Sequence, residues 1–208
     1  MTTKLGLIAD VHATAEPVAE ALALFRREAV DAVICAGDIA GYFDDPAPVV
    51  DLLIAGGCRC IIGNHDQAWL NTHADLEDTR TFSFLSRLPE TLRFELEHKS
   101  VSVVHAQPPR QQHGGIKLLD IESQLIAENV DYWSQQLQAY RSDVLIVGHT
   151  HQVFAEKLGG TLVINPGSTV FNHSCAVLTL PSMQVEFYAL SNRQILKTWN
   201  WGMAVRGL

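Results

Sequence analysis

The fold is set by residues 5–38, which read LGLIADVHATAEPVAEALALFRREAVDAVICAGD. Leu5–Ala9 is a short apolar run stopped by Asp10, as expected for a buried strand that ends in a loop. Helical spacing of apolar residues follows, from a capping threonine at Thr14 to about Glu28. A second apolar run, Ala32–Cys35, comes next. A strand, a helix and a strand in this order predict a parallel sheet covered by helices.

The alternation continues along the chain. We expect a helix over Pro48–Ala55, a strand over Cys58–Ile62 and a strand over Val144–Val147. Alternating apolar residues predict a hairpin of Leu92–Glu97 and Val101–His105, which makes the sheet mixed. The remaining helices are expected around Asp75–Leu85 and within Lys117–Tyr140.

Four further apolar runs near the C-terminus are separated by turn residues. They predict strands that would form a second sheet: Val153–Lys157, Thr161–Ile164, Cys175–Leu180 and Gln184–Leu190. Two sheets with apolar faces would stack as a sandwich with helices on the outer faces. We therefore predict an α/β protein with one domain over residues 1–208.

Composition narrows the class of protein. The chain has 208 residues and 47% hydrophobic residues, which is typical of a globular domain with a full core. Its formal charge of −8 disfavours a grip on long nucleic acid, but a small anionic substrate is compatible with it. From the N-terminal residues we expect neither a signal peptide nor a membrane span, and the four cysteines are expected to be reduced thiols. These features predict a cytoplasmic protein.

Five short motifs, each with metal-binding side chains, follow strands in order. They are Asp10-Val11-His12, Gly37-Asp38, Gly63-Asn64-His65-Asp66, Val104-His105 and Gly148-His149-Thr150-His151. Imidazoles, carboxylates and an amide oxygen are the ligands that Mn, Fe, Co, Ni and Zn accept. Residues i and i+2 of an extended segment point the same way, so each Asp-x-His or His-x-His pair can face one site. Each motif alone is a weak signal, and their joint occurrence predicts a metallohydrolase.

In these motifs the sequence resembles the calcineurin-like metallophosphoesterase superfamily, from Asp10 to about Ser168. It looks most like the compact bacterial and archaeal phosphodiesterases, an impression strengthened by residues 37–42 and by Asn165-Pro166-Gly167-Ser168. The resemblance implies a four-layer α/β/β/α sandwich of two mixed sheets flanked by helices. It also implies hydrolysis of a small phosphodiester by in-line attack of a hydroxide that bridges two metal ions.

The resemblance also implies a role for each motif residue. One metal would be held by Asp10, His12, Asp38 and His151, and the other by Asp38, Asn64, His105 and His149. Asp38 would bridge the two ions. The ions are two divalent metals, with Mn expected and Fe, Ni, Co or Zn also compatible. His65 would stabilise the transition state or protonate the leaving group, and Asp66 would orient the ring of His65.

Two regions depart from this pattern or lie outside it. The run after His105 begins with Ala106 instead of the glycine usual in the family, so the resemblance does not define the role of the loop Gln107–Gly115. Arg110 or His113 can enter the site from this loop. Trp199, Trp201 and Met203 near the C-terminus are expected to complete the core or to cover an interface in a homo-oligomer.

Other activities remain open. A phosphomonoesterase would use the same metals with an added cation or a closed pocket, whereas a nuclease is less compatible with the acidic charge. The acidic segment 41–45 speaks against a phosphoprotein phosphatase. A scaffold that binds protein partners without catalysis is the alternative from another class, although no ligand is missing here.

Overall fold

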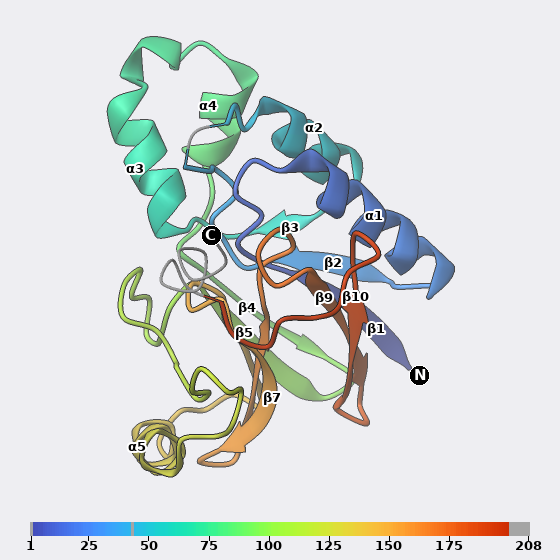
Figure 1. Ribbon diagram of the computed structural model, residues 1–208, viewed down its shortest axis with the longest axis vertical. Coiled ribbons are helices and arrows are strands. Elements are labelled where there is room, and N and C mark those ends of the chain that lie inside the picture. The colour runs from blue at the N-terminus through green and yellow to red at the C-terminus, as the bar shows by residue number, and fades with distance from the viewer. Residues whose placement is uncertain (1, 43, 200–208) are drawn as a thin grey trace.

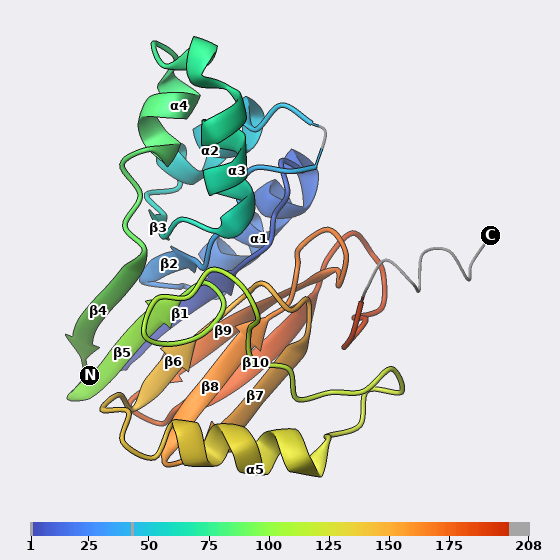
Figure 2. The ribbon, with the colours of Figure 1, turned by 90° about the vertical axis from the view of Figure 1, so that its left-hand side faces the viewer.

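A computed structural model describes residues 2–42 and 44–199, so Trp201 and Met203 lie outside the described residues. Two mixed sheets of five strands each pack face to face, with helices on the outer faces (Figure 1). Helices α1 to α4 lie on one side of the strands and α5 lies on the other (Figure 2). The predicted fold class, a four-layer α/β/β/α sandwich, is confirmed.

The first sheet has the strand order β10-β9-β1-β2-β3. Strands β1, β2 and β3 are parallel to one another, while β9 pairs antiparallel with β1 and with β10. Its strands are β1 (Thr3–Ile8), β2 (Ala32–Cys35), β3 (Arg59–Cys60), β9 (Ser174–Leu180) and β10 (Gln184–Ala189). Its helical layer consists of α1 (Ala15–Arg27), α2 (Ala47–Ala55), α3 (Asn64–Thr72) and α4 (Arg80–Leu85), with the 3-10 turn η1 (Ala74–Leu76) between α3 and α4.

The second sheet has the order β4-β5-β6-β8-β7. Strands β5, β6 and β8 are parallel, and hairpin partners flank them on both edges. Its strands are β4 (Thr91–Leu96), β5 (Lys99–Val104), β6 (Val144–Ile146), β7 (Val153–Leu158) and β8 (Thr161–Pro166). Helix α5 (Ala127–Gln136) covers its outer face.

Three apolar clusters fill the three spaces between the layers. Alternate residues of β1 serve different clusters: Leu5 and Leu7 pack between the sheets, whereas Ile8 packs against the helices α1 and α2. A third cluster joins the second sheet to Leu137 at the end of α5. Because β1 is buried on both faces, its sequence is a continuous apolar run, as in the central strands of parallel sheets.

The division of strands between the sheets differs from the expectation. The last two strands, β9 and β10, return to the first sheet, and the hairpin of β4 and β5 belongs to the second. Strand β1 pairs with β2 along one edge. Along its other edge it pairs with β9, where Leu5 lies opposite Leu178. Almost every residue of β9 is buried, as a strand with neighbours on both faces requires.

The helices after β3 also differ from the expected one around residues 75–85. Helix α3 already begins at Asn64, inside the third motif, because Asp66 accepts a hydrogen bond from the Gly63 amide at 2.8 Å and caps the first turn. A second helix, α4, starts after Thr79, whose hydroxyl accepts from the Phe82 amide. Within the described ranges, no helix combines the length and apolar character needed to cross a membrane.

Candidate metal centre

The metal-binding motifs lie in the loops that follow five parallel strands, and these loops meet on one rim of the sandwich. The carboxyl ends of parallel strands share one edge of a sheet, so residues distant in sequence converge there. Asp10 and His12 follow β1, Asp38 follows β2, Asn64 and His65 open α3 after β3, His105 follows β5, and His149 and His151 follow β6.

The backbone brings these side chains together through left-handed turns. The φ angles are 49° at Asp10, 42° at His12, 54° at Asp38, 66° at His149 and 47° at His151. Asp and His adopt this region more readily than most residues, and such outliers gather at functional sites. The residues that we expected to converge do so, but through tight loops rather than extended backbone.

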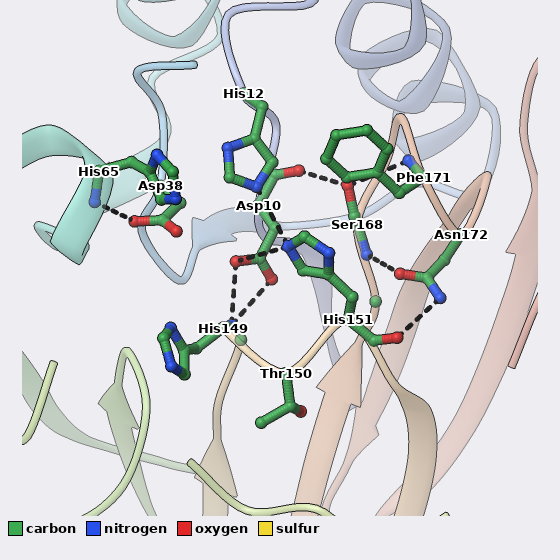
Figure 3. Close-up of polar contacts among 12 residues, drawn as sticks. Asp10, His12, Asp38, His65, His149, Thr150, His151, Ser168, Phe171 and Asn172 are labelled. Carbon is green, nitrogen blue, oxygen red and sulfur yellow. Dashed lines mark hydrogen bonds and ion pairs between the residues drawn. The ribbon is translucent and has the colours of Figure 1, made fainter. Parts of the chain in front are cut away.

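Asp10, His12 and His151 form the first cluster. Their candidate ligand atoms all lie within 4.8 Å of one another. The Nε2 atoms of His12 and His151 are 3.1 Å apart, and Nε2 of His151 is 3.8 Å from Oδ1 of Asp10. The three side chains point toward one another in Figure 3. The loop is fixed by the His149 amide, which donates to both carboxylate oxygens of Asp10 at 2.9 and 3.0 Å.

Asp38, His105 and His149 form the second cluster, and Asn64 joins it through its amide oxygen. Oδ1 of Asn64 lies 3.0 Å from Nε2 of His105 and 2.9 Å from Nδ1 of His149. Nδ1 of His105 donates to the Ala36 carbonyl oxygen at 2.8 Å, which turns Nε2 toward the site. Such a hydrogen bond is the usual way to fix the ring of a metal-binding histidine.

Asp38 and His12 connect the two clusters. Together with His65 they form a third group whose candidate ligand atoms lie within 4.8 Å of one another. Asp38 therefore reaches both clusters, as a bridging carboxylate must. The donor set of imidazole nitrogens, carboxylates and one amide oxygen fits borderline divalent cations. The described residues thus contain candidate ligand clusters for divalent metals, while their assignment to two specific ions stays a prediction.

Burial keeps three of the imidazoles neutral. It lowers the pKa of His12 and of His149 to about 4 and that of His151 to about 3. A histidine binds a metal only as the neutral imidazole, so protons do not compete at these rings near pH 7.

His105 has the opposite shift. Burial is the largest single influence and would lower its pKa, but the charge and hydrogen bond of Asp38, 3.3 Å away, act together with the charge of Asp10 and raise the pKa to about 10. For Asp38, burial alone would raise the pKa, but the nearby imidazoles, led by His105, hold it well below its usual range. Burial raises the pKa of Asp10 to about 7. Without metal, a proton on His105 therefore balances the charge of Asp38.

Metal binding is expected to release protons. Because the pKa of His105 is raised to about 10, its proton is present at every pH below that value and must leave when Nε2 binds a cation. Titration with Mn²⁺ at pH 8 should release about one proton per chain. Calorimetry in two buffers of different ionisation enthalpy measures this number. His105→Gln should remove the release and His73→Gln should not; an unchanged release in His105→Gln would contradict the assignment.

His65 and Asp66 lie at the start of α3, beside the clusters. The His65 amide donates to Oδ1 of Asp38 at 2.9 Å. Both oxygens of the buried Asp66 accept from backbone amides, of Ala40 at 2.6 Å and of Gly63 at 2.8 Å. These bonds tie the loop after β2 to the start of α3. They favour a structural role for Asp66 over the orientation of the His65 ring that we expected, because no hydrogen bond of the described residues joins the two side chains.

A buried hydrogen-bond network supports the first cluster from behind (Figure 3). The hydroxyl of Ser168 donates to the Asp10 carbonyl at 2.5 Å, and the Ser168 amide donates to Oδ1 of Asn172 at 2.8 Å. Nδ2 of Asn172 in turn donates to the carbonyls of His151, at 2.9 Å, and Leu196, at 2.6 Å. The loops that carry Asp10 and His151 are thus held by side chains from a third loop.

A pocket of about 200 Å³ opens at the clusters. It is lined by Asp38, Tyr42, His65, Lys117, His149, Thr150, His151 and Trp199. Tyr42, Lys117 and Trp199 were not identified as site residues from the sequence, and Trp199 was expected in the core or at an interface. The signal available for Tyr42 was its position just beyond the Gly37-Asp38 motif.

The loop Gln107–Gly115 approaches the site at His113 and at Gly115, whose backbone lies against His149 and Thr150. The ring of His113 lies 6.2 Å from that of His149, centroid to centroid. Arg110 instead pairs with Glu90, with 3.4 Å between Nη1 and Oε2, on the exposed surface. Of the two loop residues that we expected to enter the site, His113 therefore neighbours the candidate metal ligands and Arg110 does not.

Comparison with known proteins agrees with this geometry. A family model described as the calcineurin-like phosphoesterase superfamily domain matches residues 3–182. A probable metallophosphoesterase of Methanothermobacter thermautotrophicus is 29% identical over 184 residues, which cover 87% of this chain and 83% of the relative. A hypothetical protein of Pyrococcus horikoshii has a similar structure, with a TM-score of 0.72 and 13% identity over 99% of this chain and 92% of that one. The structure of an archaeal phosphodiesterase is similar with a TM-score of 0.60 and 20% identity, over 90% of this chain and 100% of that one.

Proposed function

Because this chain belongs to the calcineurin-like phosphoesterase superfamily, we propose that it is a phosphodiesterase that hydrolyses small phosphodiesters with two bound divalent cations, most naturally Mn²⁺. The observation that carries the proposal is the position of Asp38, which lines the pocket and whose carboxylate belongs to one candidate ligand group with His105 and His149 and to another with His12. The pocket volume of about 200 Å³ and the net charge of −8 favour a small ester over long nucleic acid.

The residues of the site have separate roles in this proposal. Two cations held by such clusters supply an activated water and neutralise the charge that develops on the phosphoryl oxygens. Asp38 would serve as a ligand to both cations and is itself fixed by the His65 amide. The His65 ring lines the pocket, where it can donate a proton to the leaving oxygen. Asp66 holds the loop of Asp38 and the start of α3 in register.

A second candidate function, phosphomonoester hydrolysis, is favoured by Lys117. This exposed lysine lines the same pocket, and a cation there can neutralise the additional negative charge of a monoester. A nuclease and a scaffold that binds protein partners are further alternatives on the same fold.

The turnover rates of matched esters test these candidate functions. We expect bis(p-nitrophenyl) phosphate to be hydrolysed faster than p-nitrophenyl phosphate in the presence of Mn²⁺, and chelation by EDTA to abolish both reactions. The panel should include Co²⁺, Ni²⁺, Zn²⁺ and Mg²⁺, together with cyclic and linear nucleotide diesters. Faster turnover of the monoester would favour the second candidate, and metal binding without turnover of any ester would favour the scaffold.

A further inference from the structure

Three aromatic side chains that the sequence did not assign to the site form a wall beside the candidate metal ligands. The rings of Phe171 and Trp199 stack at a centroid distance of 4.0 Å and an interplanar angle of 13°. Trp199 lies 5.5 Å from His151, and Tyr42 stacks on His12 at 4.8 Å. All three aromatic residues are partly exposed, and Tyr42 and Trp199 line the pocket.

The backbone holds Trp199 firmly at this wall. Its amide donates to the His151 carbonyl at 3.2 Å, and the preceding residue, Thr198, forms a β-bridge with Gln152. The Leu196 amide donates to the carbonyl of Asn172 at 3.1 Å. The indole is therefore presented to the pocket by a segment that is hydrogen-bonded to the one carrying the ligand candidate His151.

The pocket is also lined by a cation, Lys117, and the chain beside it is held by Gln152, the residue that forms the β-bridge with Thr198. Its side-chain oxygen accepts from the amides of Leu118 and Leu119 at 2.8 and 3.1 Å, and its Nε2 donates to the Leu119 carbonyl. These bonds fix the chain next to Lys117. A single buried residue, Gln152, thus bonds both to the segment that ends in Trp199 and to the residues that follow Lys117.

We propose that the wall of Tyr42, Phe171 and Trp199 binds an aromatic ring carried by the phosphate ester, while Lys117 contacts phosphate oxygens. Aromatic rings stack on partly exposed indole and phenol faces, and they do so without demanding a particular hydrogen-bonding pattern. Nucleobases and simple aryl groups share this chemistry. The proposal rests on the proposed function, because it places the phosphorus at the metal clusters.

Two pairs of phosphate monoesters measure the contribution of the aromatic ring to binding affinity. Adenosine 5′-monophosphate and ribose 5-phosphate differ only in the base, and phenyl phosphate and methyl phosphate differ in the aryl group. Calorimetry with the Mn²⁺-loaded protein measures binding without turnover if each titration is short and hydrolysis is monitored. We expect the ligand with the ring to bind about fivefold to tenfold more tightly in at least one pair. Preference in the first pair alone identifies a nucleobase, and preference in both pairs identifies any aromatic ring.

Variants of Trp199 and Lys117 distinguish stacking of Trp199 on a ligand ring from packing of Trp199 against His151. Trp199→Leu should bring the affinity ratio of the preferred pair close to one, with affinity for the ligand without a ring changed less than about twofold. Trp199→Phe should keep most of the ratio. Lys117→Met should weaken both members of a pair equally. If Trp199→Leu instead lowers metal content and affinity for all ligands together, the indole only packs against His151, and the proposal is wrong.

Failure of this inference is distinguishable from failure of the proposed function. A ring preference that depends on Trp199, in a protein that hydrolyses no ester, would support the aromatic wall while contradicting the enzyme. Ester hydrolysis with equal binding inside both pairs would support the enzyme and overturn the wall.

Discussion

Replacing Asp38 by asparagine is expected to abolish phosphoesterase activity and to weaken the binding of both metals. Asparagine has nearly the same shape, but it offers one neutral oxygen in place of two charged ones. A site that brings two cations together then loses the negative charge between them. Mutations of residues that only support ligands cost about 10-fold to 100-fold in affinity or activity, so a bridging ligand should cost more than about 100-fold.

The same change should alter the metal-free protein in a defined direction. The pKa of His105 is raised chiefly by Asp38, so in Asp38→Asn burial becomes the dominant influence and the pKa of His105 should fall well below about 10. NMR titration of the histidine rings would measure it. The proton release on metal binding should fall accordingly at pH 8.

Metal content per chain and kcat/KM should be measured together. Asp51→Asn is a matched control, because Asp51 lies in α2, outside the motifs, and pairs with Arg80 at 2.8 Å on the exposed surface. The control should keep full activity and metal content. Full activity in Asp38→Asn, or the loss of one metal with the other bound at unchanged affinity, would contradict a bridging role.

The elements near the site were the most predictable from sequence. The strand Ala32–Cys35 lies where expected, because an apolar run that stops at Gly37-Asp38 has both a clear pattern and a clear end. The convergence of Asp10, Asp38 and His105 followed from the rule that parallel strands end on one edge. Local pattern and general topology were sufficient for these features.

Pairing between distant strands was not predictable in the same way. Periodicity reports which faces of a strand are buried but not which strand lies beside it, so β9 was assigned to the wrong sheet. The pocket position of Trp199 depends on backbone bonds to His151 and Gln152, which leave no periodic signal in the sequence. The left-handed turns at Asp10 and His12 were missed because an Asp-x-His pair reads equally well as extended chain.

His65→Ala is expected to slow unactivated esters far more than activated ones. If the His65 ring protonates the leaving oxygen, a poor leaving group such as an alkoxide loses about 100-fold to 10,000-fold, whereas p-nitrophenolate needs little protonation and loses less than about tenfold. The comparison uses methyl p-nitrophenyl phosphate and dimethyl phosphate under the same conditions with Mn²⁺. His73→Ala, at the other end of α3, is the control and should change neither rate.

Metal content decides between the roles open to His65. The ring belongs to a group with His12 and Asp38 whose candidate ligand atoms lie within 4.8 Å, so geometry alone is compatible with a ligand. A proton donor predicts full metal content in His65→Ala together with the unequal losses. Equal losses on both esters at full metal content would instead assign the ring to charge stabilisation. A loss of metal would make it a ligand, and the first cluster, with Asp10 and His151, would then have to be redrawn around His65.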